Sequence, residues 1–424
     1  SPAPLTVRPN DVSRTYDGTT AATGTVAVTA GSLLGGDTIT GNTLAFSDRN
    51  AGTGKTVSIT GVTISDGNSG NNYSLTQQTN TNSTITQRTL STWTGAGGNT
   101  LWSNAANWDA LPDLSNVLAV SIPSGAQVNH DLGTTTNLQT LTSAGILDLT
   151  AGTLSMSGAL NTAVYNQTVG STLTGSGSLA VSNSFSRTGG SISLGGAVNI
   201  TQATGNLVVG GMTAASVDLT ASTGHITQNG AVHTTGGLVK AVARDGIALN
   251  DAGNQFAMLS ANNTSTGNID VINGVALDLQ KAVTANGNVT VSSTGGVSTS
   301  GPVAANGGTL SLTSNSPLTI GSSGASATGN VSLTATNVTS AGNMVLNGNV
   351  SSSTGSVNMN AAGTLTQNAG VSSVTGTNAT AGGAITFGAS ATTSGPQSYT
   401  AAGTPVTAPV PAPPPAGGGG TPTP

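Results

Sequence analysis

Residues 224–237 read GHITQNGAVHTTGG, residues 295–308 read GGVSTSGPVAANGG, and residues 363–376 read GTLTQNAGVSSVTG. All three stretches keep one order: a glycine, two short alternating strands separated by a tight turn, and a new glycine. The second copy begins 71 residues after the first, and the third begins 68 residues after the second. A motif that returns at such offsets is typical of a repeat architecture.

A shorter unit recurs through the same region: Gly-Asn or a similar glycine pair, followed by alternating apolar and polar residues. It reads GNLVV at 205, GNIDV at 267, GNVTV at 287, GGTLSL at 307, GNVSL at 329, GSVNM at 355 and GGAITF at 382. Its first apolar position falls at Ile269, Val289, Leu310 and Val331, which are 20, 21 and 21 residues apart. A period near 20, built from strands of four or five residues, predicts a parallel β-solenoid.

The alternation explains how such strands form a core. Residues two apart, such as Val289 and Val291, point to the same face of a strand. One strand cannot bury that face alone, but stacked copies line a continuous core and pair their backbones with the coils above and below. Gly and Asn supply the turn conformations at the corners. Since parallel crossovers are almost always right-handed, we expect a right-handed β-helix.

Composition excludes several classes of protein. Of 424 residues, 5% are charged, none is Glu, and 61 are Gly. No segment shows a period of 3.6, so we expect an all-β chain without long helices. The regular alternation argues against disorder, despite the low charge and near-neutral hydropathy. Because the chain has no Cys, no disulfide framework can stabilise it, and stability has to come from the ladder between coils.

Charge and hydropathy also limit the partners. The net charge is −5, and the nine basic residues are scattered singly, so the sequence lacks a basic patch for nucleic acid. It has no apolar run long enough for a transmembrane helix and no signal peptide at Ser1. No phosphate-binding loop, calcium nonapeptide or other cofactor motif is present, and we expect no cofactor.

Residues 1–90 follow a different pattern. Five or six alternating strands are separated by Gly, Asn and Asp turns, which predicts a small β-sandwich. The opening SPAPLTV is similar to the later ITQRTLST, with Leu5 matching Leu90 at an offset of 85. We therefore interpret this point as a repeat boundary and expect a longer parent protein.

Several spaced blocks of these 90 residues resemble a known repeat. They are Tyr16-Asp17-Gly18-Thr19-Thr20, Gly36-Asp37, the block DRNAGTGK at 48–55, and NNYSL at 71–75. Together they resemble the YDG-type repeat of large filamentous-haemagglutinin-like bacterial surface proteins, and the solenoid resembles the shafts of the same adhesins. The resemblance implies an extracellular adhesin or fibre of a Gram-negative bacterium. It further implies export by a two-partner or autotransporter-like route, and no enzyme activity.

Residues 91–115 contain all three tryptophans, Trp93, Trp102 and Trp108. Similar segments introduce β-helices in autotransporter-like proteins. We expect a hydrophobic cap that covers the open edge of the first coil. The alternative is an aromatic platform that stacks sugar rings.

We place the β-helix at 116–400. Up to residue 204 its coils are less regular, and we expect Asn161 to Thr174 to bulge out as a loop. An extended Pro/Gly-rich tail follows at 401–424. The simpler interpretation of this tail is a disordered linker or a wall-crossing segment, and the alternative is pairing with a neighbouring subunit. The prolines of the tail in that role are Pro405, Pro409, Pro411, Pro413, Pro414 and Pro415.

Catalytic and metal sites are not indicated. A polysaccharide-active β-helix needs clustered carboxylates and bases on one face. Asp218, Asp270 and Asp278 fall in separate rungs, and Arg244 and Asp245 on a strand would point to opposite faces.

The positions of the histidines in the sequence do not indicate a metal site either. His225 and His233 lie in the first motif copy, but the corresponding positions of the later copies hold no His. Ordinary surface residues are the simpler reading, and His130 stands alone.

Three functions remain open. The interpretation carried forward is an extracellular structural protein, a subunit of a self-assembling surface filament or biofilm-matrix fibre, whose partner is another copy joined end to end or through the tail. The alternative is a monomeric adhesin shaft that binds carbohydrate, such as an extracellular polysaccharide, or a host surface. A polysaccharide-active enzyme is the third.

Overall fold

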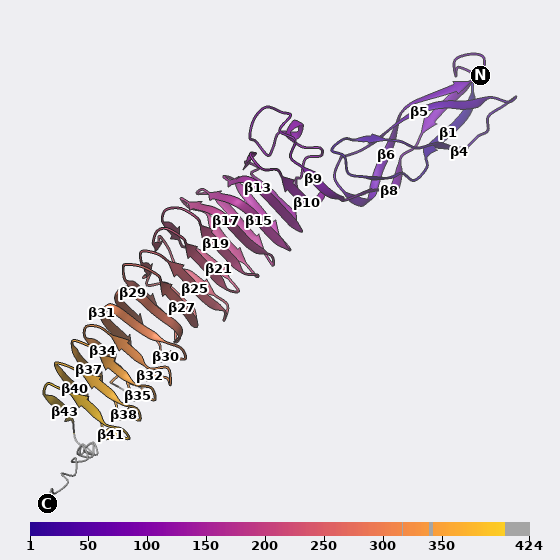
Figure 1. The fold of residues 1–424 in the computed structure, drawn as a ribbon. Coiled ribbons are helices and arrows are strands. Elements are labelled where there is room, and N and C mark those ends of the chain that lie inside the picture. Colours follow the sequence, from indigo (N-terminus) through magenta and orange to yellow (C-terminus); the bar gives the residue numbers. More distant parts are fainter. Residues whose placement is uncertain (316, 339–341, 403–424) are drawn as a thin grey trace, which may run out of the picture. The chain divides into compact units, whose positions relative to one another are not determined.

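The computed structural model describes residues 1–315, 317–338 and 342–402, and it is all-β (Figure 1). A parallel β-solenoid of about 14 turns follows a small N-terminal region of β-sheet. The chain divides into two compact units. Unit 1 comprises 1–178 with 188–190, and unit 2 comprises 179–187 with the residues from 191 onward. The predicted fold class is therefore confirmed, whereas the six tail prolines lie outside the described residues.

Unit 1 begins with two small sheets. One has the order β4-β1-β7 and the other the order β2-β8-β6-β5-β3. Buried apolar side chains from both sheets, including Leu5, Phe46 and Val57, form the core of this N-terminal domain. The strands are β1 (Ala3–Pro9), β2 (Ser13–Thr15), β3 (Ala21–Ala22), β4 (Val26–Ala30), β5 (Thr38–Phe46), β6 (Gly52–Ser65), β7 (Tyr73–Gln77) and β8 (Asn80–Thr86).

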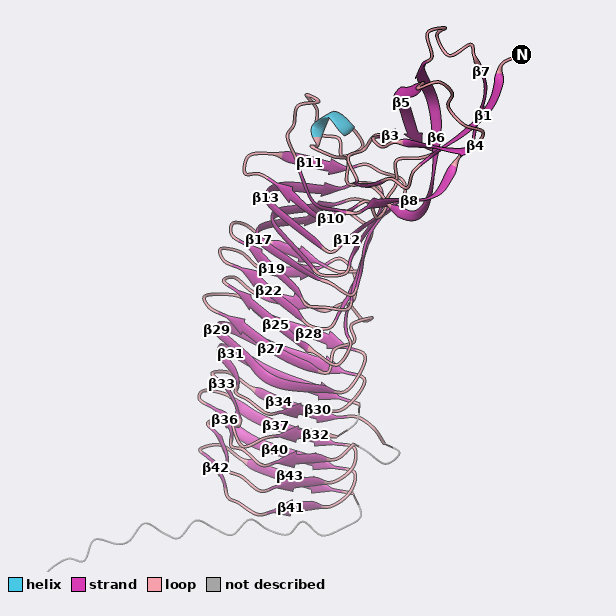
Figure 2. Cartoon of the chain, turned by 90° about the vertical axis from the view of Figure 1, so that its right-hand side faces the viewer, coloured by secondary structure: helices cyan, strands magenta, loops and turns pink. Residues whose placement is uncertain are grey.

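The rest of unit 1 contains the tryptophan segment and the first coils. A single turn of 3-10 helix, η1 (Ala105–Asn107), stands out among the strands (Figure 2). The strands are β9 (Arg88–Thr92), β10 (Val117–Ile122), β11 (Gln127–His130), β12 (Thr135–Leu138), β13 (Thr140–Leu149), β14 (Gly152–Met156), β15 (Ala159–Gln167) and β16 (Ser171–Gly175). Strand β9 pairs with β10, so the ladder starts before the predicted boundary at residue 90.

Strands β17 to β43 wind through unit 2, where the strands of successive coils lie side by side (Figure 1). The long strand β29 runs over three faces of the solenoid, and β31 runs over two. The bounds are β17 (Ser178–Arg187), β18 (Ser191–Leu194), β19 (Val198–Gln202), β20 (Leu207–Val209), β21 (Met212–Ala214), β22 (Val217–Ala221), β23 (Ile226–Gln228), β24 (Val232–Thr234), β25 (Leu238–Ala243), β26 (Ile247–Leu249), β27 (Met258–Asn263), β28 (Ile269–Asn273), β29 (Leu277–Ser293), β30 (Val297–Thr299), β31 (Val303–Ser314), β32 (Leu318–Ile320), β33 (Ala325–Ala327), β34 (Val331–Ala335), β35 (Met344–Leu346), β36 (Val350–Ser352), β37 (Ser356–Ala361), β38 (Leu365–Gln367), β39 (Val371–Ser373), β40 (Gly376–Ala381), β41 (Ile385–Phe387), β42 (Ala391–Thr393) and β43 (Gln397–Ala401).

The core of unit 2 consists of apolar columns that run from coil to coil. Ile269 lies opposite Val289, Val289 opposite Leu310, and Leu310 opposite Val331. All four side chains are at most 1% exposed. Burying such a side chain stabilises the fold by roughly 1.5–3 kcal/mol. The register inferred from the 20- and 21-residue spacing is therefore confirmed.

The Gly-Asn corners are held by side chains that reach the next coil. Asn268 Oδ1 accepts a hydrogen bond of 2.9 Å from the Asn288 amide, and Asn288 Oδ1 accepts one of 2.8 Å from the Thr309 amide. Gly267, with φ of 99°, could not carry a side chain, because a Cβ there would lie 2.2 Å from the Asp245 carbonyl oxygen. At each Gly-Asn corner, the Gly thus allows two backbones to approach closely, and the Asn side chain accepts a hydrogen bond from a backbone amide.

Two sequence-based expectations are wrong. The 71-residue offset does not connect equivalent positions: from Ile226, three steps of register lead through 247 and 269 to Val289, eight residues before Val297. The first motif copy therefore lies on a different face from the second. The segment 161–174 is also not a bulging loop, because it lies largely in β15 and β16, and β15 pairs with β13.

Candidate functional site

The tryptophan segment is joined to the first coil by backbone pairing. Strand β9 runs parallel to β10, with Leu90 opposite Ala119. Farther along, Leu101 bridges Asn129, whose carbonyl accepts a hydrogen bond of 2.8 Å from the Trp102 amide. The segment thus supplies the backbone partners that β10 and β11 would otherwise lack at the start of the solenoid.

The three indoles pack against one another. The ring centroids of Trp93 and Trp108 lie 4.9 Å apart in a T-shaped arrangement, and those of Trp102 and Trp108 lie 4.6 Å apart. Trp93, Trp102 and Trp108 are 6%, 0% and 5% exposed. Sugar stacking requires an accessible ring face, so this burial favours hydrophobic packing over the aromatic platform.

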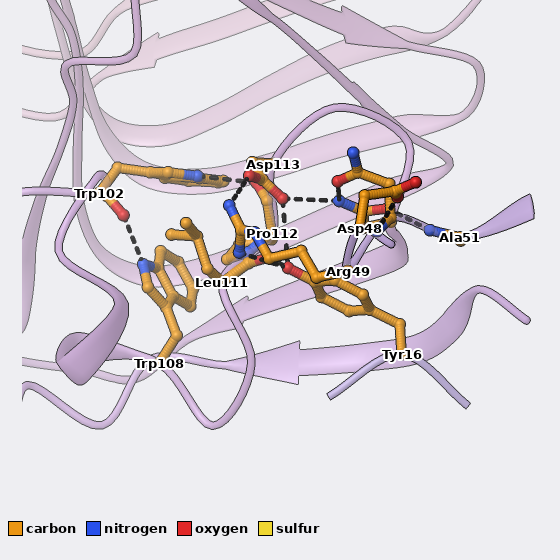
Figure 3. A network of polar contacts seen from close by, with 11 residues as sticks. Tyr16, Asp48, Arg49, Ala51, Trp102, Trp108, Leu111, Pro112 and Asp113 are labelled. Atoms are coloured by element: carbon orange, nitrogen blue, oxygen red, sulfur yellow. Dashed lines mark hydrogen bonds and ion pairs between the residues drawn. The ribbon is translucent and has the colours of Figure 1, made fainter. Parts of the chain in front are cut away.

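Two of the three indole N–H groups donate to backbone carbonyls. Trp108 Nε1 donates to the Trp102 carbonyl at 2.8 Å, and Trp102 Nε1 donates to the Pro112 carbonyl at 2.9 Å (Figure 3). Because an unpaired N–H in such a place would be costly, these bonds fix the segment as well as the rings.

His130 lies beneath this cluster. Its ring centroid is 5.0 Å from that of Trp102, and its side chain is fully buried. Nδ1 lies 3.1 Å from the Ala151 carbonyl oxygen, and Nε2 lies 3.0 Å from Thr136 Oγ1. Burial lowers the pKa of His130 below its usual value, although the backbone contacts partly oppose this. His130 therefore acts as a neutral polar core residue.

A polar network connects the N-terminal domain to the tryptophan segment (Figure 3). The Tyr16 hydroxyl donates to the Leu111 carbonyl at 3.0 Å, and Asp113 Oδ1 lies 3.3 Å away as a second acceptor. Arg49 Nη1 donates to the same hydroxyl at 3.0 Å, while Nη2 forms an ion pair with Asp113. The side chain of Tyr16 is inaccessible to solvent, whereas that of Arg49 is one-third exposed.

Asn116 extends this junction. Its Oδ1 accepts a hydrogen bond of 2.8 Å from the Ala51 amide, and its Nδ2 donates to Asp113 Oδ1 at 2.7 Å and to Asn50 Oδ1 at 3.1 Å. Its backbone carbonyl also accepts from the Arg88 amide at 2.9 Å. One buried side chain therefore joins a loop of the N-terminal domain to the chain leading into β10.

The environment of Tyr16 changes its ionisation. Burial, followed by the negative charge of Asp113, raises the pKa of Tyr16 to about 12, and Arg49 opposes the shift. The hydroxyl therefore stays protonated at physiological pH, which it must do to donate to the Leu111 carbonyl.

Two of the three aspartates singled out from the sequence have local partners. Asp218 forms an ion pair of 2.9 Å with Lys240 from the next coil, and Asp278 accepts hydrogen bonds from Ser298 and Ser300. Burial raises the pKa of the Asp270 carboxyl. The three aspartates therefore lie in separate local environments rather than in one cluster.

The expectation for Arg244 and Asp245 is wrong. They follow β25 in a turn, where their side chains are 3.4 Å apart, rather than on opposite faces of a strand.

The two histidines of the first motif copy lie in different parts of a coil. His225 directly precedes β23, whereas His233 lies in β24, which belongs to another sheet. His233 Nε2 is 2.9 Å from the Gly253 carbonyl oxygen. Within the described ranges, no three His, Cys, Asp or Glu side chains gather as a metal-ligand group.

The sequence reasoning missed the Tyr16 junction as a site. Tyr16 and Arg49 belong to the blocks that resemble the YDG repeat, and this signal identified them without giving their role. Asp113 and Asn116 carried no signal, because the partner of Asp113 is 97 residues away in the sequence.

Comparison with protein families identifies residues 1–81 as matching the YDG domain model. No curated protein and no solved structure matches the chain. No helix within the described part of the chain is long and apolar enough to cross a membrane. The YDG match and the solenoid are consistent with an extracellular structural or adhesive role.

Proposed function

We propose that this chain is an extracellular structural protein and the subunit of a self-assembling bacterial surface filament or matrix fibre. The observation that carries the proposal is the repeated register of unit 2, where coil after coil presents the same short strands and buried columns. A solenoid of this kind is built by nearest-neighbour contacts, so its length can grow without a larger core. The proposed role is mechanical and includes no catalytic step.

The junction in unit 1 supports a mechanical role for the chain. Tyr16, Arg49 and Asn116 attach the N-terminal domain through largely buried polar contacts rather than through a flexible linker. Domains that move independently are usually separated by exposed, Gly- or Pro-rich segments. A pulling force on the N-terminal domain would therefore be transmitted to the first coil.

A monomeric adhesin shaft is the second candidate, and a surface of the N-terminal domain favours it. A hollow of about 650 Å³ lies beside β6 and the following turn. Thr40, Thr63, Ser65 and Asn71 contribute polar groups to it, and Leu75 contributes an apolar one. Hydroxyl and amide groups of this kind suit a polysaccharide or a glycosylated host surface.

Electron microscopy of the purified chain at low and high concentration separates the two functions. The filament predicts uniform fibres that lengthen with concentration. Single particles at every concentration contradict the filament. In that case, binding of glycans to the full chain, compared with the variant Thr63→Lys in the hollow, would test the adhesin.

A further inference from the structure

The last coils of the solenoid contain no ionised side chain. Every Asp, Lys, Arg and His of the chain lies at or before Lys281, and none occurs from Ala282 to Pro424. One outward column of these coils comprises Thr290, Ser311, Ser332, Asn358, Asn378 and Ser398. Charge is one of the means by which β proteins prevent association of their surfaces and edges, and these coils lack it.

The final rung ends in strands with one open edge. Strand β42 pairs with β39, and β43 pairs with β40. Among residues 1–315, 317–338 and 342–402, no further register runs along the other edge of β42 or β43. The start of the solenoid differs, because β9 and the bridge at Leu101 cover it.

The direction of the backbone groups in β43 can be assigned. The Thr377 amide donates to the Pro396 carbonyl, and the Ala402 amide donates to the Ala381 carbonyl. Since residues alternate along a parallel ladder, even-numbered residues from 396 to 402 bond to β40. The N–H and C=O groups of Gln397, Tyr399 and Ala401 therefore face the open edge.

The side chains at this end resemble an exposed core section. Gln397 continues the buried column of Val357 and Thr377, yet it is exposed because no coil follows it among the described residues. Phe387 and Tyr399 lie beside it with their ring centroids 4.9 Å apart. Among the described residues, the rung thus combines backbone groups that have no partner strand with a small aromatic surface.

A second copy of the chain is the occupant that this edge fits best. The chain's own tail is a poor strand for it, since eight of the residues from 403 to 424 are Pro and lack an N–H group. A two-fold axis instead places β43 antiparallel to the β43 of the second copy and β41 opposite β42. Backbone edges are self-complementary in this arrangement, and an uncharged rung does not repel itself.

We propose that two copies join tail to tail through β41, β42 and β43 in a closed, two-fold dimer. This surface deepens the proposed function and rests on it, since assembly of a fibre requires a contact between copies. The dimer would be its repeating unit.

Sedimentation velocity over a concentration series tests the dimer. Ala401→Pro removes an edge N–H without removing a bond to β40, and Gln397→Lys places like charges across the two-fold axis. Each should raise the dimer dissociation constant at least about tenfold. Ser332→Lys adds the same charge three rungs earlier and should leave the constant unchanged, as should cutting the chain after Ala402. Circular dichroism checks that each variant retains its β structure.

Several outcomes overturn the proposal: a wild-type chain that stays monomeric, a dimer insensitive to both edge variants, or a dimer that appears or disappears when the tail is cut. Microscopy of the same samples separates this failure from that of the proposed function. Fibres that persist without the dimer leave the filament intact and exclude this edge as its contact. Absence of both dimer and fibre contradicts both.

Discussion

Removal of one hydroxyl group tests the junction between the N-terminal domain and the first coil. Tyr16→Phe keeps the buried ring and deletes the atom that donates to the Leu111 carbonyl and accepts from Arg49. The buried carbonyl then loses a donor, and the partly exposed guanidinium loses an acceptor. A loss of this kind costs about 1–2 kcal/mol of unfolding free energy, or a factor of about 5–30 in the unfolding equilibrium.

The effect of Tyr16→Phe on stability should also depend on pH. The pKa of Tyr16 is about 12 in the folded chain, against an ordinary value of about 10 in the unfolded chain. The stability from this shift is complete below pH 10 and is lost as pH rises from 10 to 12. At pH 11 the free energy of unfolding of the wild type should therefore be about 1.4 kcal/mol lower than at pH 8 through this effect. Tyr16→Phe has no hydroxyl to ionise and should not show this loss. The gap between the two proteins should shrink accordingly.

Tryptophan fluorescence is the suitable assay. All three tryptophans lie in unit 1, so urea unfolding followed by their emission reports this unit. Tyr399→Phe is a matched control, because among the described residues that hydroxyl donates to Gln397 of the same strand, and this strand belongs to unit 2 rather than to the unit that the fluorescence reports. It should change the free energy of unfolding of unit 1, derived from the urea midpoint, by less than about 0.5 kcal/mol. An unchanged midpoint for Tyr16→Phe at pH 8, or an equal gap at pH 8 and pH 11, would refute the role assigned to Tyr16.

Three further perturbations follow from the geometry. The lowered pKa of His130 means that unit 1 loses up to about 1.4 kcal/mol per pH unit as pH falls below about 6.5, and His130→Gln should remove this dependence of the fluorescence midpoint. Leu312→Ala in the fully buried column should cost about 2–5 kcal/mol, seen as faster amide exchange in neighbouring coils, whereas Val338→Ala, 83% exposed, should have little effect. Asn288→Ala should speed exchange of the Thr309 amide by about 2- to 10-fold, and unchanged exchange would mean that the corner amide is dispensable.

The sequence predicted those features of the fold that depend on local pattern. Ile269, Val289, Leu310 and Val331 repeat with strand alternation and glycine corners, so their spacing gave the register directly. The 71-residue offset was misleading because it is the sum of two steps. Three coils lead from Ile226 to Val289, and eight more residues lead to Val297 on the next face. The apparent loop at 161–174 contains polar residues whose groups bond inside the coil, such as Thr162 Oγ1 to the Val164 carbonyl at 2.8 Å.

The site was less accessible from sequence. The clustering of Trp93, Trp102 and Trp108 indicated a cap, and their burial now favours it. The partnership of Tyr16 with Asp113 depends on how two distant segments pack, and neither residue type nor spacing specifies that. A lone Asp in a loop looks the same whether it is solvated or buried against an Arg.

Spin-label distances test most directly that copies of the chain assemble through the end of the solenoid. The chain has no Cys, so single variants Ser398→Cys and Thr290→Cys each carry one label, in the last rung and five rungs earlier in the same column of unit 2. We expect a shorter distance between the labels of two copies for Ser398→Cys than for Thr290→Cys. A shorter distance for Thr290→Cys, or no coupling for either label at concentrations where copies associate, would contradict assembly through this end.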